Sequence, residues 1–207
     1  MSCHEYEELL EAKFEEGLDA GLSDTEAEKY ALSLLEENVW PKALDNVQLD
    51  NDVPEHMKKL IDVLYEESWY FDSDIHGMKH WKAVEKNGRM IAALNGACIK
   101  TIEYFSVLHD CMRWNEGYDP GHGPRGAEFA KEFRDLIELD DAAFEVLCTA
   151  ISTHTEGRRW FLEAKNPVIA TCWDADRLDI DRIAGIQVDP HQLITNEARF
   201  ILKQRQA

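Results

Sequence analysis

Several histidine and aspartate residues in this chain have the types and spacing needed to bind a divalent cation. His109 and Asp110 are adjacent, and a turn-rich segment that follows them carries His122. An imidazole nitrogen and a neighbouring carboxylate oxygen can bind one cation together. Such pairs also occur by chance, so the histidines and aspartates elsewhere in the chain decide how this one is interpreted.

Apolar periodicity predicts helices that carry these side chains on buried faces. His109 follows Phe105 by four residues and Ile102 by seven, which is the spacing of one helical face. His154 likewise follows Ile151 by three. A third apolar face, formed by Ile169, Cys172 and Ile180, contains Asp176, and a carboxylate there is costly unless it is paired or bound to metal.

Each of these side chains also has an explanation without a metal. His80 could lie on the surface near a helix start, and His109 could be a hydrogen-bonded core histidine. The carboxylates could form ion pairs with arginines close in sequence, Asp110 with Arg113 and Asp176 with Arg177 or Arg182. One cation would satisfy all four groups at once, whereas the alternatives need several separate partners.

The first 68 residues are expected to form an acidic helical N-terminal appendage. Helices are predicted over residues 4–21 and 25–37, the second opened by a capping box of Ser23 and Glu26. Val39–Val53 is interpreted as a connection, and Pro54 opens a third helix. None of these residues has a pattern that indicates chemistry.

Residues 69–207 form the predicted functional domain. Caps at residues 72–74 precede a long helix towards Asn95, in which Gly88 marks a packing point or a break. Residues 115–123 read as a loop, with Pro124 in the first turn of the next helix and His122 just ahead of it. Helices follow over residues 140–154, from Pro167, and near the end of the chain. Strand signals are nearly absent, so the fold class is all-α.

The composition of the chain argues against nucleic-acid-binding, membrane-spanning and secreted classes of protein. The net charge of −19 argues against a nucleic-acid polymer as partner, and 14 of those charges belong to residues 1–70. No apolar run approaches the roughly 18 residues of a membrane span, and the polar N-terminus is unlike a secretory signal. The five cysteines form no CxxC pair, which favours buried reduced thiols and a cytoplasmic location.

The combined pattern resembles the HD-domain superfamily of metal-dependent phosphohydrolases. That family carries a His, then a His-Asp pair, then a distant Asp, all on helices. The corresponding segments here are His80 to Val84, the pair 109–110 after Val107 and Leu108, and the run DADRLD at 174–179. The resemblance covers roughly residues 70–185 and implies an HD-domain helical bundle with an extra helical N-terminal segment.

The resemblance implies a divalent metal cofactor, one or two ions per chain, of manganese, iron, cobalt, nickel, magnesium or zinc. The implied metal ligands are His80, His109, Asp110 and Asp176. Many HD enzymes hold a second metal through two further histidines, which here correspond to His122 and His154; alternatively these two hydrogen-bond substrate or water. His76 is expected to contact substrate or to support a ligand.

The implied activity is hydrolysis of a small, nucleotide-like phosphate ester. Asp110 would bind metal and orient water, and Arg113 and Arg125 would bind phosphate, ahead of Lys79, Arg158 and Arg159. Trp114 could stack on a base. The remaining candidate bases or substrate contacts are Glu116, Asp119 and Asp179.

Two other function classes fit the same pattern. A di-iron HD-type oxygenase would use all six ligands for chemistry with O₂. A non-catalytic module would bind a nucleotide or a partner and keep metal for stability. The expected partner is a small-molecule phosphate, with no membrane, and the oligomeric state stays open, a homodimer included.

Overall fold

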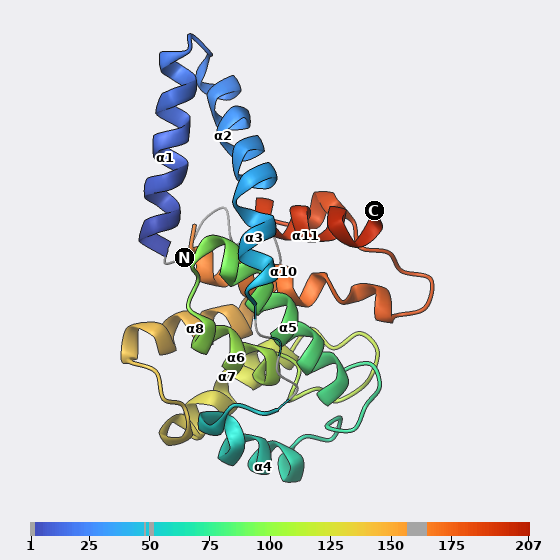
Figure 1. Cartoon of the computed structure of the whole chain (residues 1–207). Coiled ribbons are helices and arrows are strands. Elements are labelled where there is room, and N and C mark those ends of the chain that lie inside the picture. The colour runs from blue at the N-terminus through green and yellow to red at the C-terminus, as the bar shows by residue number, and fades with distance from the viewer. Residues whose placement is uncertain (1–2, 48, 50–51, 157–164) are drawn as a thin grey trace.

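The computed structural model describes residues 3–47, 49, 52–156 and 165–207, and within these ranges every regular element is a helix (Figure 1). The predicted all-α class is confirmed. The α-helices are α1 (Cys3–Asp19), α2 (Asp24–Asn38), α3 (Trp40–Asp45), α4 (Lys58–Glu67), α5 (Met78–Asn95), α6 (Ile99–Leu108), α7 (His122–Glu132), α8 (Asp141–Thr153), α10 (Pro167–Arg177) and α11 (Asn196–Gln206). Short 3₁₀ turns are Glu55–Met57, Arg134–Leu136, Ile180–Arg182 and Pro190–Gln192.

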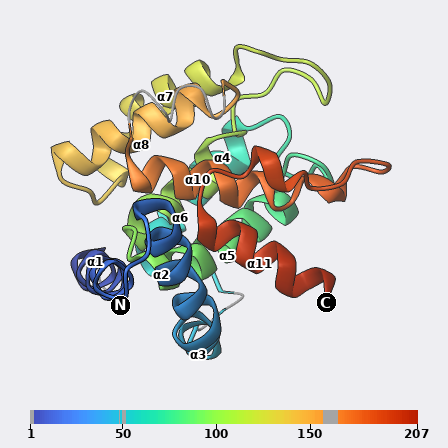
Figure 2. The same cartoon turned by 90° about the horizontal axis from the view of Figure 1, so that it is seen from above.

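Helices α5, α6, α8 and α10 pack against one another and form the centre of the molecule (Figures 1 and 2). Their inward faces bury large apolar side chains, among them Trp81, Phe105 and Trp173. Helix α7 packs on α8, and α11 lies against α5 and α10. None of the helices in the described ranges is both long and apolar enough to cross a lipid bilayer.

Helices α1 and α2 form a hairpin that projects from this centre (Figure 1). The predicted capping box is present: the Glu26 carboxylate accepts from the backbone N–H of Ser23 at 3.0 Å, and the Ser23 side chain accepts from the backbone N–H of Glu26. The hairpin is tied back to the C-terminal helix, where the Tyr6 hydroxyl donates to Glu197. The domain boundary at residue 68 stays a prediction.

The prediction that Val39–Val53 is only a connection was wrong for its first part. Residues 40–45 form α3, and Trp40 is fully buried with its ring 5.2 Å from that of Phe200. Pro41 suggested a loop, but proline is tolerated in a first helical turn because its missing N–H would have no partner there. Pro54 precedes a 3₁₀ turn, and α4 itself begins at Lys58.

Gly88 is a packing point and not a break, because α5 runs through it without interruption. A Cβ atom at this position would lie 2.2 Å from Cγ2 of Ile102 on α6. The predicted start of α5 shifts, however. Ser73 caps the preceding turn by accepting from the backbone N–H groups of Ile75 and His76, and the helix begins only at Met78.

His122 was expected just ahead of a helix, but it is the first residue of α7, two positions before Pro124. The turn begins there because the backbone N–H of His122 bonds the carbonyl of Asp119 at 3.3 Å. The thiols are also less uniform than predicted. Cys111, Cys148 and Cys172 are buried, whereas Cys98 is exposed.

Candidate metal centre

Five helices deliver six potential ligands to one place in the interior. His80 comes from the first turn of α5, and the pair at 109–110 directly follows α6. The N-terminus of α7, the C-terminus of α8 and the last turn of α10 supply the others. The complete set is His80, His109, Asp110, His122, His154 and Asp176, the set that the sequence pattern assigned to metal.

The C-terminal ends of α6 and α8 orient two of the histidines in the same way. Carbonyl groups in the last turn of a helix lack an intrahelical partner and accept bonds from side chains. His109 Nδ1 lies 3.0 Å from the carbonyl oxygen of Ser106, and its ring stacks on Phe105. His154 Nδ1 lies 2.7 Å from the carbonyl oxygen of Ile151. A proton on Nδ1 leaves Nε2 as an unprotonated lone pair.

The other two histidines are fixed by an equivalent bond. His122 Nδ1 donates to the carbonyl oxygen of Asp119. His80 Nδ1 lies 2.7 Å from Oδ2 of Asp179, which comes from a segment 99 residues away. A carboxylate behind a histidine sets its tautomer and raises its basicity as a ligand. All four imidazoles therefore present Nε2 to the interior.

The Nε2 atoms meet in two pairs. His80 and His109 approach to 3.1 Å, and His122 and His154 to 2.7 Å. Two lone pairs facing each other at these distances repel unless a cation lies between them. Ligands bound side by side at about 2.1 Å from one ion are separated by about 3.0–3.4 Å. The separation of His80 and His109 falls in this range, whereas His122 and His154 are closer than it and would have to move apart to bind one ion.

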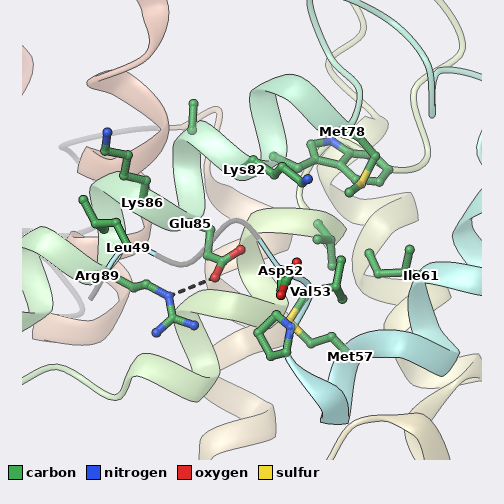
Figure 3. Close-up of a pocket in the computed structure, with 14 residues that line it drawn as sticks. Leu49, Asp52, Val53, Met57, Ile61, Met78, Lys82, Glu85, Lys86 and Arg89 are labelled. Carbon is green, nitrogen blue, oxygen red and sulfur yellow. Dashed lines mark hydrogen bonds and ion pairs between the residues drawn. The ribbon is translucent and has the colours of Figure 1, made fainter. Parts of the chain in front are cut away.

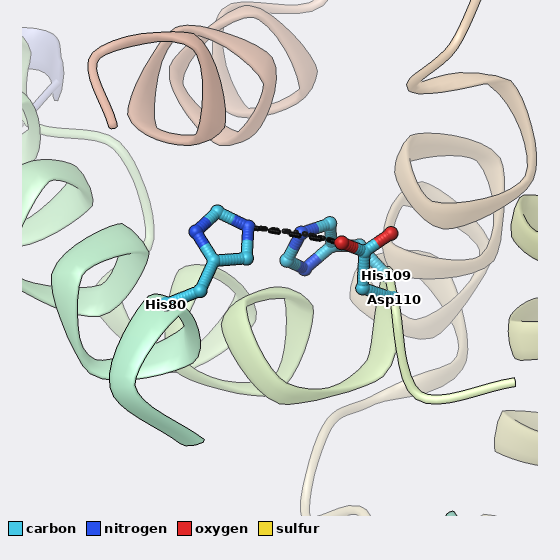
Figure 4. A group of neighbouring side chains, drawn as sticks. All are labelled: His80, His109 and Asp110. Atoms are coloured by element: carbon cyan, nitrogen blue, oxygen red, sulfur yellow. Dashed lines mark hydrogen bonds and ion pairs between the residues drawn. The ribbon is translucent and has the colours of Figure 1, made fainter. Parts of the chain in front are cut away.

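Asp110 lies between the two pairs and offers one oxygen to each. Oδ2 is 3.8 Å from His80 Nε2 and 3.7 Å from His109 Nε2, and Figure 4 shows these three side chains converging. Oδ1 is 3.0 Å from His122 Nε2 and 3.9 Å from His154 Nε2. The carboxylate can therefore bridge two ions.

Asp176 completes the first group. Its Oδ1 is 3.2 Å from His80 Nε2 and 3.7 Å from His109 Nε2, and the side chain is 24% exposed, which leaves one side open to solvent. The possible ion pairs of Asp176 with arginine are absent among the described residues. Arg177 instead approaches Asp174, and Arg182 approaches Asp179.

Electrostatics favour neutral imidazoles at His109 and His154 and ionised carboxylates at Asp110 and Asp176. Burial lowers the pKa of His109 to about 3 and also lowers that of His154. Burial opposes ionisation of Asp110 and Asp176, but the surrounding histidines outweigh it and hold both pKa values below the usual range. His80 differs, because bonds to Asp176 and Asp179 outweigh its burial and raise its pKa. Mixed nitrogen and carboxylate donors of this kind suit several first-row divalent metals.

The two candidate side chains nearest the bridge are engaged with protein atoms. His76 places Nδ1 at 2.8 Å from Asp110 Oδ2 and Nε2 at 3.2 Å from the carbonyl oxygen of Glu116. Arg113 Nη1 donates to Asp110 Oδ1 at 3.1 Å, and its other nitrogens donate to the carbonyl oxygens of Asn115 and Gly117. Both residues thereby orient Asp110. The carboxylate of Glu116 accepts the Ser73 hydroxyl at 2.7 Å.

Arg125, Asp119 and Trp114 form a unit beside the centre. Arg125 Nη2 donates to Asp119 at 2.5 Å, and its guanidinium lies 3.8 Å above the Trp114 ring, which is 63% exposed. Asp119 also accepts the Trp114 backbone N–H at 2.8 Å. These two bonds outweigh burial and lower the pKa of Asp119, so this carboxylate is a weak base.

A cavity of about 530 Å³ is lined by His154 and by the cationic side chain of Arg177, which the sequence pattern did not mark as a substrate contact. The buried Nη1 of Arg177 has no hydrogen-bond partner among the described residues. The one sequence feature that could have indicated a role for Arg177 is its position directly after Asp176. Lys79 is exposed beside Asp74, and Arg158 and Arg159 lie outside the described residues.

Comparisons with protein-family models, with curated proteins and with solved structures give no match for this chain.

Proposed function

We propose that the protein is an HD-type, metal-dependent phosphohydrolase that acts on a small phosphate ester. The supporting observation is the convergence of four imidazole Nε2 atoms, in two pairs, on the two oxygens of Asp110. His80, His109, Asp110 and Asp176 would hold one ion, and Asp110, His122 and His154 a second. Divalent ions there would supply Lewis-acid polarisation of a phosphoryl oxygen and acidify bound water.

The protein's own residues would position the ester and move protons. Arg177 lines the same cavity as His154, and its guanidinium, whose Nη1 lies 3.7 Å from Asp174 Oδ1, would supply positive charge near a phosphate. Arg125 presents a guanidinium fixed by Asp119 and Trp114, and the exposed Trp114 ring offers a stacking surface for a nucleotide-like base. Glu116 would be the base, since its hydrogen bond is to the neutral Ser73 hydroxyl, whereas Asp119 is paired with Arg125 and Asp179 with His80.

The test combines metal analysis with turnover on freshly purified protein. Wild type is expected to contain two divalent ions and to hydrolyse members of a panel of phosphomonoesters, diesters and nucleotides. His122→Ala with His154→Ala should retain one ion, and Asp110→Asn should lose both ions and the activity. His4→Ala, at an exposed histidine far from the centre, is the matched control. Full activity in Asp110→Asn would refute the proposal.

A di-iron oxygenase is the second candidate, because four imidazoles and two carboxylates form a complete protein ligand set for two iron ions. It predicts about two irons per chain and oxygen consumption without phosphatase activity. Metal-dependent stability with no turnover of either kind would instead indicate a binding module.

A further inference from the structure

The cavity beside Trp81, between α5 and residues 52–61, is lined in part by charged side chains that already have partners (Figure 3). Arg89 pairs with Glu85 at 2.9 Å, and Lys82 also interacts with the rest of the protein. Charges engaged in this way indicate no ligand. A second pocket, at the end of α4 and over the turns that follow it, has a different composition.

Aromatic side chains dominate this second pocket, which measures about 440 Å³ and lies within the range of roughly 300–1,000 Å³ typical of small-molecule sites. Tyr65, Trp69, Tyr70 and Phe71 are four of the eight described residues that line it. The ring of Tyr65 packs edge-on against Phe71, with centroids 5.2 Å apart. Trp69 is 79% exposed and Tyr65 is 61% exposed, although tryptophan is highly buried on average. Both rings are therefore accessible to a ligand.

Hydrogen bonds fix the pocket against the segment 111–116. Three hydroxyl groups of its lining donate to acceptors in that segment, Ser68 at 2.8 Å, Tyr70 at 3.3 Å and Ser73 at 2.7 Å. The pocket is therefore preorganised, which lowers the entropic cost of binding. Because these protons are donated within the protein, the three hydroxyl groups have none left for a ligand.

Asp72 gives the pocket one negative charge that the protein does not compensate. This exposed carboxylate forms no ion pair or hydrogen bond with the described part of the chain. Glu116 does not add to the count, because it accepts the Ser73 hydroxyl and its Oε2 lies 3.8 Å from His76 Nε2. The described lining contains no lysine or arginine. The face of an aromatic ring is also negative and attracts cations, so the rings and the carboxylate favour the same kind of ligand.

We propose that this pocket binds a small organic monocation of the quaternary-ammonium class. The methyl groups of the cation contact the rings of Tyr65 and Trp69, and its charge lies near Asp72. Such a cation needs no hydrogen-bond donor from the protein, which matches a lining whose hydroxyl protons are already used. A quaternary nitrogen has no lone pair and cannot bind a metal ion. The site is therefore separate from the metal centre and independent of its proposed activity.

Choline is the probe, and titration calorimetry on the full chain measures its binding. We expect a Kd below about 1 mM. The control ligand is the alcohol in which a tert-butyl group replaces the trimethylammonium group of choline, which keeps the shape and removes the charge. It should bind at least about tenfold more weakly.

Variants at exposed positions separate this pocket from the general acidity of the surface. Trp69→Ala should weaken choline binding by at least about tenfold, Trp69→Phe should stay within about threefold of wild type, and Asp72→Asn should lose at least about threefold. Tyr118→Ala and Asp74→Asn are the matched controls, an exposed ring and an exposed carboxylate outside the pocket. Circular dichroism checks the fold of each variant. Losses confined to the pocket variants support the proposal. Equal affinity for the neutral alcohol, choline binding that survives in Trp69→Ala, or no choline binding by wild type overturns it.

Discussion

The bond between Asp179 and His80 allows a graded test of how the candidate metal ligands are oriented. Asp179 Oδ2 lies 2.7 Å from Nδ1 of His80, whose side chain is fully buried. In Asp179→Asn the amide oxygen can still accept from Nδ1–H, but the negative charge is lost. In Asp179→Ala no acceptor remains, so the proton can move to Nε2 and remove the lone pair that binds metal.

Loss of such a supporting partner typically costs 10–100-fold in metal affinity. The asparagine variant, which keeps the hydrogen bond, should lose about tenfold in metal affinity, or about 1.4 kcal/mol. The alanine variant should lose about 100-fold, or about 2.8 kcal/mol. Binding of the ion proposed at the other histidine pair should be affected less, because His122 and His154 are oriented by backbone carbonyl groups.

The assay is a competition titration of Mn²⁺ or Zn²⁺ against a chromophoric chelator, with metal content measured in parallel. Asp181→Asn is the matched control, since Asp181 is an exposed carboxylate in the short 3₁₀ turn that directly follows Asp179. Circular dichroism shows whether each variant keeps its helices. Metal affinity in Asp179→Ala within a factor of about two of the control would refute the argument that this bond sets the tautomer.

Three other perturbations test the packing, the buried charges and the metal dependence of the fold. Gly88→Ala should lower the free energy of unfolding by about 2 kcal/mol, because overpacking against Ile102 costs about 3 kcal/mol and better helix propensity returns about 1 kcal/mol. Urea unfolding measures this loss. When Ile102 is also changed to alanine, Gly88→Ala should cost less, because the overpacking is relieved. Burial raises the pKa of Glu197 despite the hydrogen bond from Tyr6, so this carboxyl group ionises at a lower pH in the unfolded chain than in the folded one. Wild type therefore loses stability as the pH rises from the pKa of the unfolded state through the pKa of the folded state. Glu197→Gln should therefore gain in stability relative to wild type as the pH rises above 4.5, by about 1.4 kcal/mol per unit of pKa shift. A pH-independent difference would contradict this. Removal of metal with a chelator should lower the Tm, and Mn²⁺ or Zn²⁺ at about 100 times its Kd should restore about 2.7 kcal/mol; equal melting with and without metal would count against the site.

The sequence alone determined the helical class and the identity of the candidate metal ligands. Helical periodicity is a local property, so the spacing of Phe105 to His109 and of Ile151 to His154 was enough to place both histidines on inward faces. The unusual cost of a carboxylate on an apolar face similarly singled out Asp176. These inferences needed no knowledge of how the helices pack.

Only the tertiary structure decided how those ligands are oriented and what surrounds them. The partner of His80 is 99 residues away in the chain, and no local pattern links it to Asp179. The helix at Trp40 exists because its ring packs on Phe200, 160 residues further along the chain, which propensity cannot anticipate. The cavity beside Trp81 is likewise formed by segments distant in sequence. Side-chain partners and cavities depend on which helix faces meet, and that is fixed by packing rather than by the order of residues.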